Sequence, residues 1–320
     1  MNYTLLSSPL QGLTDFRFRN AFKKYFGGID TYYTPSIRLN GKLEIKPAYE
    51  IDILSKNNTD IKVIPQIITS DADEFVFAAE YVQKHGYKEL NWNLGCPYPM
   101  VTKRGMGSGL IKDPIKINTI LNKVHAESDI IVSMKMRLGY ETSDEILQVL
   151  PVLEKYPIKN IAIHPRIGRQ LYKGDVDLDS FQECLENTYH KVYYNGDITS
   201  VAVFNDRVKR FPMIDHWMIG RGLIADPFLP GMITNNTTEY PENKIEIFNN
   251  FHDMLFNDYA QAMSGPSHII MKMLQFWEYF KTSFPNSRKG LKKIKKSKSI
   301  GAYEAAVSEI LNKKYNQESA

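Results

Sequence analysis

Residues 89–97 read ELNWNLGCP, a short apolar run that ends in small and polar residues. Seven further segments follow this pattern, with helix-like stretches between them: 4–10, 29–36, 61–69, 129–138, 160–165, 191–198 and 216–223. Nearly continuous apolar runs are typical of parallel strands that are buried on both faces. Eight β/α units in about 235 residues predict an α/β fold, a (β/α)₈ TIM barrel, whose usual length is roughly 250 residues.

The stretches between these segments favour a barrel over a doubly wound sheet, the other common α/β architecture. A doubly wound sheet usually has fewer strands and a Gly-rich turn after the first strand. The first turn here, SPLQGLTD (8–15), has no such glycine pattern. Between the third and fourth predicted strands, DADEFVFAAEYVQKHG (71–86) opens with acids and closes with basic residues and a glycine, which predicts an amphipathic helix.

The sequence changes character after residue 234. NNTTEYPENK (235–244) is polar and rich in turn residues, so it predicts a linker. Beyond it, residues 245–263 place Phe248, Phe251, Leu255, Tyr259 and Ala262 at helical spacing, and 269–280 repeat the pattern with more aromatic residues. We therefore predict two domains, a barrel over 1–235 and a small C-terminal helical bundle over 245–320.

The positive charge of the chain is concentrated in this second region. Residues 241–320 hold 12 Lys and Arg against 8 Asp and Glu, and the net charge of the whole chain is +4. SRKGLKKIKKSK (287–298) alone has seven basic residues and no acid. A run of this kind is either a solvated helix face or a surface that binds a polyanion such as a nucleic acid.

Cysteine content and hydropathy bear on where the protein works. Two cysteines in 320 residues exclude a disulfide framework and suit a reducing compartment. The N-terminal MNYTLLSSPL does not resemble a secretory signal, and no apolar run approaches the roughly 18 residues of a membrane span. We expect a soluble cytoplasmic protein without contact to membranes, and nothing in the sequence points to an obligate protein partner.

Polar or small functional residues stand at nearly every predicted strand end, which is where a TIM barrel places its active site. In chain order they are Ser8 and Pro9, Gln66, Asn93 and Cys96, Lys135 and Arg137, His164 and Arg166, Asn195, Gly196 and Asp197, and finally Gly220 and Arg221.

The turns after the seventh and eighth predicted strands suggest a phosphate-bearing cofactor. YNGDI (194–198) and IGRGL (219–223) expose backbone N–H groups, and the loops after these two strands form the usual phosphate site of this fold. A lysine in the barrel mouth needs a partner such as an anion or an electron-rich ring. We expect flavin mononucleotide (FMN), with its phosphate at these turns and its ring facing Lys135 and His164.

Cys96 differs from an ordinary buried cysteine such as Cys184, which we expect to be a packing residue. Gly95 and Pro97 flank it, and two basic residues and three glycines follow within 103–109. A thiol at a strand end beside cations is a candidate acid or nucleophile. No Ser-His-Asp arrangement competes with it, and no cysteine cluster indicates a metal site.

Taken together, these motifs resemble the tRNA-dihydrouridine synthases, flavoenzymes that reduce uridine in tRNA. The resemblance covers the whole predicted barrel and rests on SPLQGLTDFRFR (8–19), Gln66, NWNLGCPYP (91–99), RGMGSGLIKDP (104–114), KMRLG (135–139), HPRIGRQLYKG (164–174), YNGDI (194–198) and IGRGLIADP (219–227). The predicted helical region is similar to the RNA-binding domain of the family in kind only.

The resemblance implies roles for individual residues. Cys96 is implied as the general acid that protonates uracil C5, while FMN, itself reduced by NADPH, delivers hydride to C6. Asn93 and Arg166 are the expected groups to orient the uracil, although many family members have H-G-R-T where this chain has HPRI at 164–167. The implied FMN contacts are Pro9, Gln66, Lys135, His164, Asn195, Gly196, Asp197, Gly220 and Arg221.

Two regions of the chain are expected to serve a tRNA substrate. The glycines within 105–109 predict a mobile loop that brings Cys96 over the base. In the basic helix we expect the contacts with tRNA to come from Lys292, Lys293, Lys295 and Lys296. Two alternatives stay open, namely an FMN-dependent reductase of a free pyrimidine such as dihydroorotate, and a non-catalytic RNA-binding barrel. The former has no need of a basic helical domain, and the latter has no need of Lys135 and Cys96.

Overall fold

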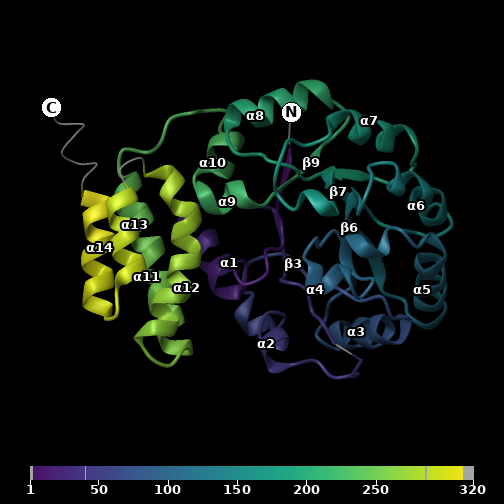
Figure 1. The fold of residues 1–320 in the computed structure, drawn as a ribbon, viewed down its shortest axis with the longest axis horizontal. Coiled ribbons are helices and arrows are strands. Elements are labelled where there is room, and N and C mark those ends of the chain that lie inside the picture. Colours follow the sequence, from purple (N-terminus) through teal and green to yellow (C-terminus); the bar gives the residue numbers. More distant parts are fainter. Residues whose placement is uncertain (1–2, 40, 285–286, 313–320) are drawn as a thin grey trace. The chain divides into compact units, whose positions relative to one another are not determined.

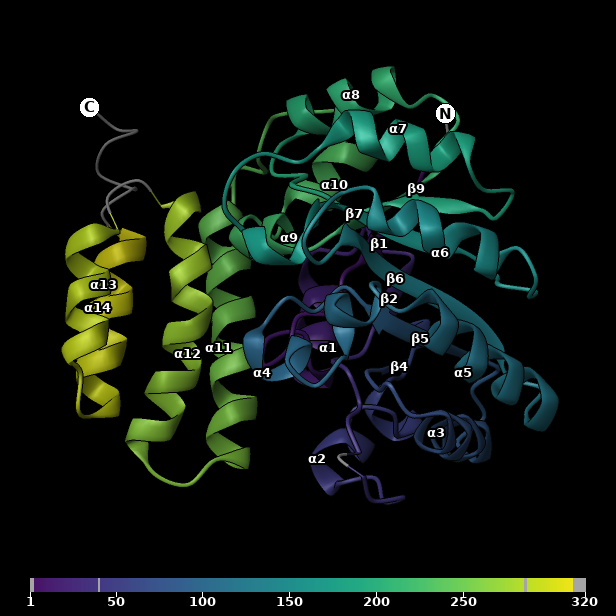
Figure 2. The ribbon, with the colours of Figure 1, turned by 45° about the vertical axis from the view of Figure 1, so that its right-hand side comes forward.

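The computed structural model describes residues 3–39, 41–284 and 287–312. Its strands run parallel and form a single sheet, wound into a barrel around an apolar core (Figures 1 and 2). The strands are β1 (Thr4–Ser7), β2 (Thr31–Tyr33), β3 (Val63–Ile64), β4 (Gln66–Ile67), β5 (Glu89–Leu94), β6 (Ile131–Gly139), β7 (Ile161–Ile167), β8 (Val192–Tyr194) and β9 (His216–Ile219). The predicted TIM-barrel class is confirmed.

One proline explains why the barrel has nine strands where the sequence predicts eight. The predicted third strand, 61–69, is interrupted at Pro65, which has no N–H to donate to a ladder. Its first half, β3, pairs with β2, and its second half, β4, pairs with β5. The sheet order β3-β2-β1-β9-β8-β7-β6-β5-β4 therefore begins and ends in one segment, which closes the barrel.

Helices surround the strands, and α3, α5, α6 and α7 form an outer layer around the barrel (Figure 1). The predicted helix over 71–86 is α3, and the side chain of Asp71 caps it by accepting from the Glu74 N–H at 3.0 Å. Short helices lie in the loops between strands. The bounds are α2 (Pro47–Glu50), η1 (Ser55–Asn57), α3 (Ala72–Lys84), α4 (Pro99–Thr102), η2 (Gly107–Leu110), α5 (Pro114–Glu127), α6 (Glu145–Leu153), η3 (Gly168–Gln170), α7 (Leu178–Glu186) and α8 (Val201–Arg210).

The chain divides into two compact units. The barrel unit comprises 1–16, 29–197 and 206–220, and the helical unit comprises 17–28, 198–205 and 221–320. Parts of the range 1–235 that the sequence analysis assigned to the barrel thus belong to the helical unit. The remaining helices are α1 (Phe16–Tyr25), α9 (Arg221–Ala225), α10 (Leu229–Thr234), α11 (Lys244–Ala262), α12 (Pro266–Phe280), η4 (Lys281–Ser283), α13 (Arg288–Lys296) and α14 (Ile300–Asn312).

Aromatic side chains form the core of the helical unit. Phe18 on α1 stacks on Phe276 of α12 with ring centroids 5.8 Å apart, and it meets Phe251 of α11 edge to face. The predicted stripe of α11 faces this core as far as Tyr259, whereas its last residue, Ala262, is exposed. Among the described helices of the chain, none combines the length and the apolar character needed to cross a membrane.

Candidate active site

The base of the site is a row of buried amide and hydroxyl groups inside the barrel. The register of β4, β5 and β6 sets Gln66, Asn91 and Ser133 side by side, and all three are fully buried. Gln66 Nε2 donates to Asn91 Oδ1 at 2.8 Å, and Asn91 Nδ2 donates to Ser133 Oγ at 3.0 Å. Each group is satisfied by its neighbour, so this row forms a rigid polar base for the residues above it.

Asn93 lies two residues further along β5, on the same face as Asn91. Its Nδ2 donates to Ser36 Oγ and to Gln66 Oε1, both at 2.9 Å. Its Oδ1 accepts from the backbone N–H groups of Gly95 and Cys96, also at 2.9 Å. All the polar capacity of the amide is used within the protein, and its effect is to fix the turn that presents Cys96.

Cys96 is half-buried, and a second loop holds its backbone. Its carbonyl accepts from both the N–H and the Oγ of Ser108, each at 3.1 Å. Gly107 has a φ of 57°, and a Cβ there would lie 2.5 Å from the Cys96 carbonyl oxygen. The buried Gly107 and Gly109 therefore allow close packing around Cys96, a physical reason for these glycines different from the loop mobility that the sequence predicted.

The surroundings of Cys96 favour its protonated form. Burial raises the pKa of the thiol above its ordinary value. The backbone N–H of Tyr98 and the positive charges of Arg137, Lys135 and Arg38 lower it in part. A thiol that keeps its proton at neutral pH is suited to act as an acid, and it is less suited to act as a nucleophile.

Lys135 is the register partner of Asn93 on the neighbouring strand β6. Lys135 is half-buried, and its ammonium group makes no hydrogen bond or ion pair with any residue that the structure describes. Burial, and next the charge of Arg137, lower the pKa of Lys135 to about 7. A half-buried cation without a partner among the described residues fits the predicted anionic or electron-rich ligand.

Arg137 and Arg166 brace the loop that follows β7. Arg137 donates to the carbonyl oxygens of Ile167 at 2.7 Å and Leu171 at 2.6 Å. Arg166 donates to the Gly174 carbonyl oxygen at 2.6 Å, forms an ion pair with Asp197, and lies with Nη1 3.2 Å from His164 Nε2.

Arg166 is therefore enclosed. Only 2% of the side chain is exposed, and its bonds join the loops after β7 and β8. This geometry favours Arg166 as a residue that positions His164 and Asp197 over one that contacts a substrate.

The remaining predicted cofactor residues lie on the turns after β1, β8 and β9. Asn195 Nδ2 donates to the Met218 carbonyl oxygen at 2.7 Å, which ties β8 to β9. Gly220 follows β9. A Cβ at this position would have Ser8 as its nearest neighbour, at an ordinary contact distance of 3.4 Å. Pro9 is half-buried just beyond β1, and Gly196 lies between Asn195 and Asp197. Arg221 opens α9, which belongs to the helical unit.

One candidate was missed by the sequence analysis. Arg38 follows β2, the only predicted strand end at which no polar residue was singled out. Its side chain is half-buried, and its Nε is enclosed without a hydrogen-bond partner. No motif marks it. However, side chains two residues apart on an extended segment point to the same face, and Arg38 comes two residues after Ser36 at the strand end, which could have identified it.

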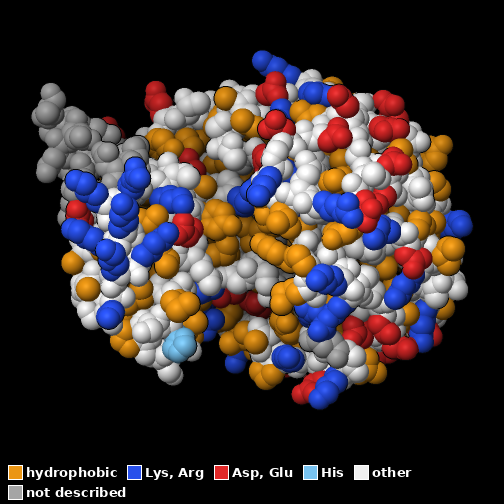
Figure 3. Space-filling view, in the orientation of Figure 1, with side chains coloured by type: hydrophobic (Ala, Val, Ile, Leu, Met, Phe, Trp, Pro, Cys, Tyr) orange, Lys and Arg blue, Asp and Glu red, His pale blue; other side chains and the backbone are white. Residues whose placement is uncertain are grey.

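The predicted basic segment forms the amphipathic helix α13. Leu291 and Ile294 are buried, and the lysines point outward, where Lys and Arg side chains gather on the surface (Figure 3). Two of these lysines have acidic partners, because Lys293 pairs with Glu309 and Lys295 lies 2.6 Å from Glu278. Lys292 and Lys296 are exposed and have no ion-pair partner among the described residues.

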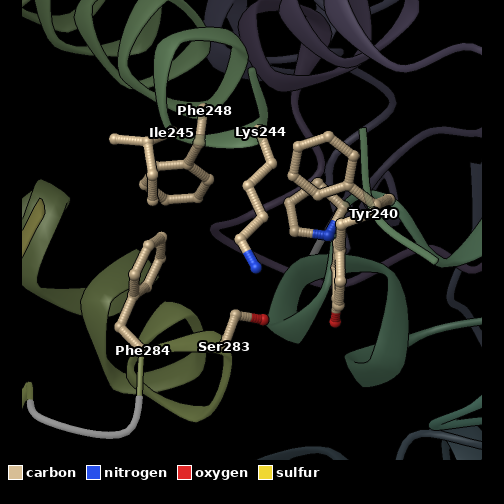
Figure 4. Close-up of a pocket in the computed structure, with 8 residues that line it drawn as sticks. Tyr240, Lys244, Ile245, Phe248, Ser283 and Phe284 are labelled. Atoms are coloured by element: carbon tan, nitrogen blue, oxygen red, sulfur yellow. The ribbon is translucent and has the colours of Figure 1, made fainter. Parts of the chain in front are cut away.

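The helical unit also contains an apolar crevice (Figure 4). Aromatic rings line most of it, and the Lys244 ammonium lies 4.4 Å from the centre of the Tyr240 ring. The side chains that Figure 4 labels are Tyr240, Lys244, Ile245, Phe248, Ser283 and Phe284. Its polar groups are engaged, with Ser283 donating to the Ala225 carbonyl and Tyr240 to Asp226.

Comparisons with known proteins identify relatives of the chain. The family model described as dihydrouridine synthase matches residues 5–315. A tRNA-dihydrouridine synthase B of Vibrio parahaemolyticus is 28% identical over 271 residues, covering 82% of each chain. A tRNA-dihydrouridine(16) synthase of Pseudomonas syringae pv. tomato is 32% identical over 237 residues, covering 71% of this chain and 73% of that protein.

Solved structures share the fold at low sequence identity. A morphinone reductase in complex with tetrahydroNAD has a TM-score of 0.53 at 8% identity, covering 76% of this chain and 89% of that one. A variant of NCR from Zymomonas mobilis has a TM-score of 0.52 at 12% identity, covering 76% and 90%. These likenesses concern the barrel architecture alone.

Proposed function

Because this chain belongs to the dihydrouridine synthase family, a family of oxidoreductases, we propose that it reduces uridine to 5,6-dihydrouridine in tRNA, with FMN as its cofactor and NADPH as the reductant. The observation that carries the proposal is that Cys96 and Lys135 lie at the ends of the adjacent strands β5 and β6, where no described residue hydrogen-bonds or pairs with Lys135. A binding protein has no need of either group. A reductase of a conjugated ring needs both a cofactor site and a proton donor.

The residues present fit a flavin. Lys135 offers a half-buried cation that the described residues leave unpaired, and the turns at Gly196 and Gly220 suit a phosphate. When bound, reduced FMN would supply the hydride that uracil C6 receives. We assign Lys135 to the ring, with Pro9, Gln66 and His164 around it, and Asn195, Gly196 and Gly220 to the phosphate end. The role of Arg221, which belongs to the helical unit, stays a prediction from the sequence. Asp197 contributes by holding Arg166 and thereby His164 in place.

Cys96 supplies the proton. Addition of hydride to C6 leaves negative charge on the uracil, and protonation at C5 by the thiol removes it. Burial keeps the pKa of the thiol above its usual value, so the proton is available at neutral pH. A positioned acid of this kind commonly accelerates a reaction by ~10²–10⁴-fold. Asn93 acts by fixing the Cys96 turn, since its own amide is fully engaged.

We assign tRNA recognition in part to α13. Its outward lysines form an electrostatic surface suited to phosphates, and Lys292 and Lys296 are the members without an acidic partner in the described chain. Lys293 and Lys295 must exchange a carboxylate for a phosphate, so we expect them to contribute less. The target base must leave its stack to reach a barrel mouth, which costs a few kcal/mol.

The test is the substitution Cys96→Ala with Cys184→Ala as its matched control. Cys184 is buried on α7, and burial raises the pKa of its thiol to about 12, as expected of a packing residue. We expect Cys96→Ala to keep the flavin absorbance band and to lose at least ~10²-fold in dihydrouridine formed per minute. Cys184→Ala should retain activity.

Several outcomes would contradict the proposal. Wild-type-like turnover of Cys96→Ala would exclude the thiol as the acid. Protein that cannot be reconstituted with FMN would exclude the cofactor. Efficient reduction of free uridine or oxidation of dihydroorotate, with no turnover of tRNA, would show that a free pyrimidine is the substrate. Dihydrouridine is measured by mass spectrometry of digested tRNA.

A further inference from the structure

Arg38 offers hydrogen-bond donors that no described residue of the chain uses. A guanidinium group has five N–H donors in a planar fork, and it stays charged at every physiological pH. The Arg38 side chain is half-buried with its Nε fully enclosed, yet it makes no hydrogen bond or ion pair with any described residue. Enclosing such a group is costly unless a partner compensates for the lost hydration. No described residue supplies that partner for the Nε donor, so the group is available to a ligand.

Backbone contacts fix where Arg38 lies. The Ile37 N–H donates to the Gln66 carbonyl at 2.7 Å, and the Ile68 N–H donates to the Ile37 carbonyl at 3.0 Å. The chain after β2 thus continues as an extended segment beside β4. Side chains alternate along such a segment, so Arg38 shares a face with Ser36, one step nearer the carboxyl ends of the strands.

The Ser36 face is the face of the active site. Ser36 Oγ donates to Gln66 Oε1, and it accepts from Asn93 Nδ2 at 2.9 Å. Asn93 in turn holds the Cys96 N–H. Arg38 therefore follows directly on the residues that position the thiol, and its charge is one of those that lower the pKa of that thiol.

The chemistry of the reaction suggests what Arg38 binds. When hydride adds to uracil C6, the electron pair of the C5=C6 bond shifts to C5 and, by conjugation, onto the carbonyl oxygen O4. The Cys96 S–H bond then breaks, a C5–H bond forms, and solvent returns a proton to the sulfur. O4 is carried by C4, which is bonded to C5. A donor close to the thiol can therefore also reach O4.

We propose that Arg38 donates hydrogen bonds to O4 of the target uracil and stabilises the negative charge that develops there during reduction. This proposal rests on the proposed function and adds a catalytic residue to it. The planar guanidinium suits a carbonyl that becomes enolate-like, and a donor aimed at developing charge acts mainly on the transition state. Arg38 should therefore affect the rate at saturating tRNA more than the affinity for tRNA.

The test compares Arg38→Met, Arg38→Lys and the control Arg210→Met, which removes an exposed arginine that pairs with Asp179. Each flavin-loaded protein is reduced, mixed with saturating tRNA, and followed for dihydrouridine over a single turnover. We expect Arg38→Met to be about 10²-fold slower, as for removal of one oxyanion donor, and Arg38→Lys to recover part of the rate. The Kd for tRNA of all three variants should stay close to the wild-type value, and so should the rate of Arg210→Met.

A modified substrate supplies an independent readout. In tRNA with 4-thiouridine at the target position, a sulfur atom replaces O4 and accepts hydrogen bonds poorly. We expect the wild-type protein to reduce this substrate more slowly than uridine. With 4-thiouridine as substrate, Arg38→Met should lower the rate much less than it does with uridine. Non-additivity of the two changes is the signature of a direct contact.

Each alternative outcome has a distinct meaning. If Arg38→Met weakens tRNA binding and flattens its salt dependence at an unchanged single-turnover rate, Arg38 contacts a phosphate and the proposal is wrong. Additive effects of the two changes would also overturn it. If Arg38→Met loses its flavin or unfolds, Arg38→Lys takes its place in the test. Wild-type rates of Arg38→Lys with both uridine and 4-thiouridine would then refute the contact. Absence of dihydrouridine with the wild-type protein refutes the proposed function instead.

Discussion

Lys135 lies where charge is disfavoured, and the sequence already indicated that a lysine in a barrel mouth needs a partner. The structure adds the consequence for titration, since burial and Arg137 lower its pKa from 10.5 to about 7. At neutral pH the ammonium is only partly charged. An anionic or electron-rich ligand would favour the charged form, so binding of the flavin should take up a proton at this residue.

Stability of the apoprotein should rise with pH because of Lys135. Between pH 7 and 10.5 the unfolded chain binds a proton that the folded chain does not, so the free energy of unfolding increases with pH over this window. The slope due to this group is at most ~1.4 kcal/mol per pH unit. Urea unfolding of apoprotein at several pH values from 7.5 to 9 should show a steeper rise for wild type than for Lys135→Met. Parallel curves would contradict the shift.

Cys96 and Lys135 could be predicted from the sequence because each residue type is unusual at a strand end. It assigned Asn93 and Arg166 to the uracil, whereas the structure engages both with protein partners. Arg38 was not found. Which side-chain hydrogen-bond donors lack a protein partner depends on the register between strands and on loop packing. Neither can be predicted from the sequence of a single segment. The roles of Asn93 and Arg166 stay predictions that direct measurement must decide.

At the scale of elements, apolar runs and turn residues sufficed to predict the barrel. The interruption at Pro65 was not predicted, although the proline was visible, because a proline at a strand position is compatible with an edge, a bulge or a break. Only the pairing of β3 with β2 and of β4 with β5 shows that it is a break within one segment.

The helix pair α13–α14 depends on a glycine for its close approach. A Cβ at Gly290 would lie 2.2 Å from Ile310 Cγ1 and 3.2 Å from the Ala306 carbonyl oxygen. Gly290→Ala should force the helices apart and destabilise the protein by ~1–3 kcal/mol, despite the better helix propensity of alanine. Gly301 on α14 is the matched control, because a Cβ there meets nothing within 4 Å.

Thermal unfolding decides this prediction. Gly301→Ala should leave the Tm unchanged or raise it, since the gain in helix propensity is up to ~1 kcal/mol. Gly290→Ala should lower it. Equal shifts for the two variants would mean that the approach of α13 to α14 is not limited by the side chain at residue 290.

At the scale of the whole molecule, affinity for tRNA should depend on salt through the lysines of α13. The double change Lys292→Ala and Lys296→Ala removes two cations without an ion-pair partner in the described chain. It should reduce the slope of log K against log salt by about 2. Lys293→Ala with Lys295→Ala removes two cations that already neutralise Glu309 and Glu278, so the reduction should be smaller. Filter binding at several salt concentrations measures both, and equal slopes would contradict the assignment.

The presence of a helical region after the barrel was predictable from composition, but the makeup of the helical unit was not. Residues 17–28 read as an ordinary helix between the first two strands. Their membership in the helical unit depends on the stacking of Phe18 on Phe276, a pairing across more than 250 residues of sequence that no local pattern encodes.

That placement of α1 has a consequence for synthesis on the ribosome. Residues 17–28 are translated more than 200 residues before their partners Phe251 and Phe276. Until then Phe18 and Phe22, both fully buried in the finished protein, have no core to enter. A nascent chain must therefore carry an exposed aromatic segment until those partners are translated, and a product terminated near residue 235 would keep that segment exposed and be prone to aggregate.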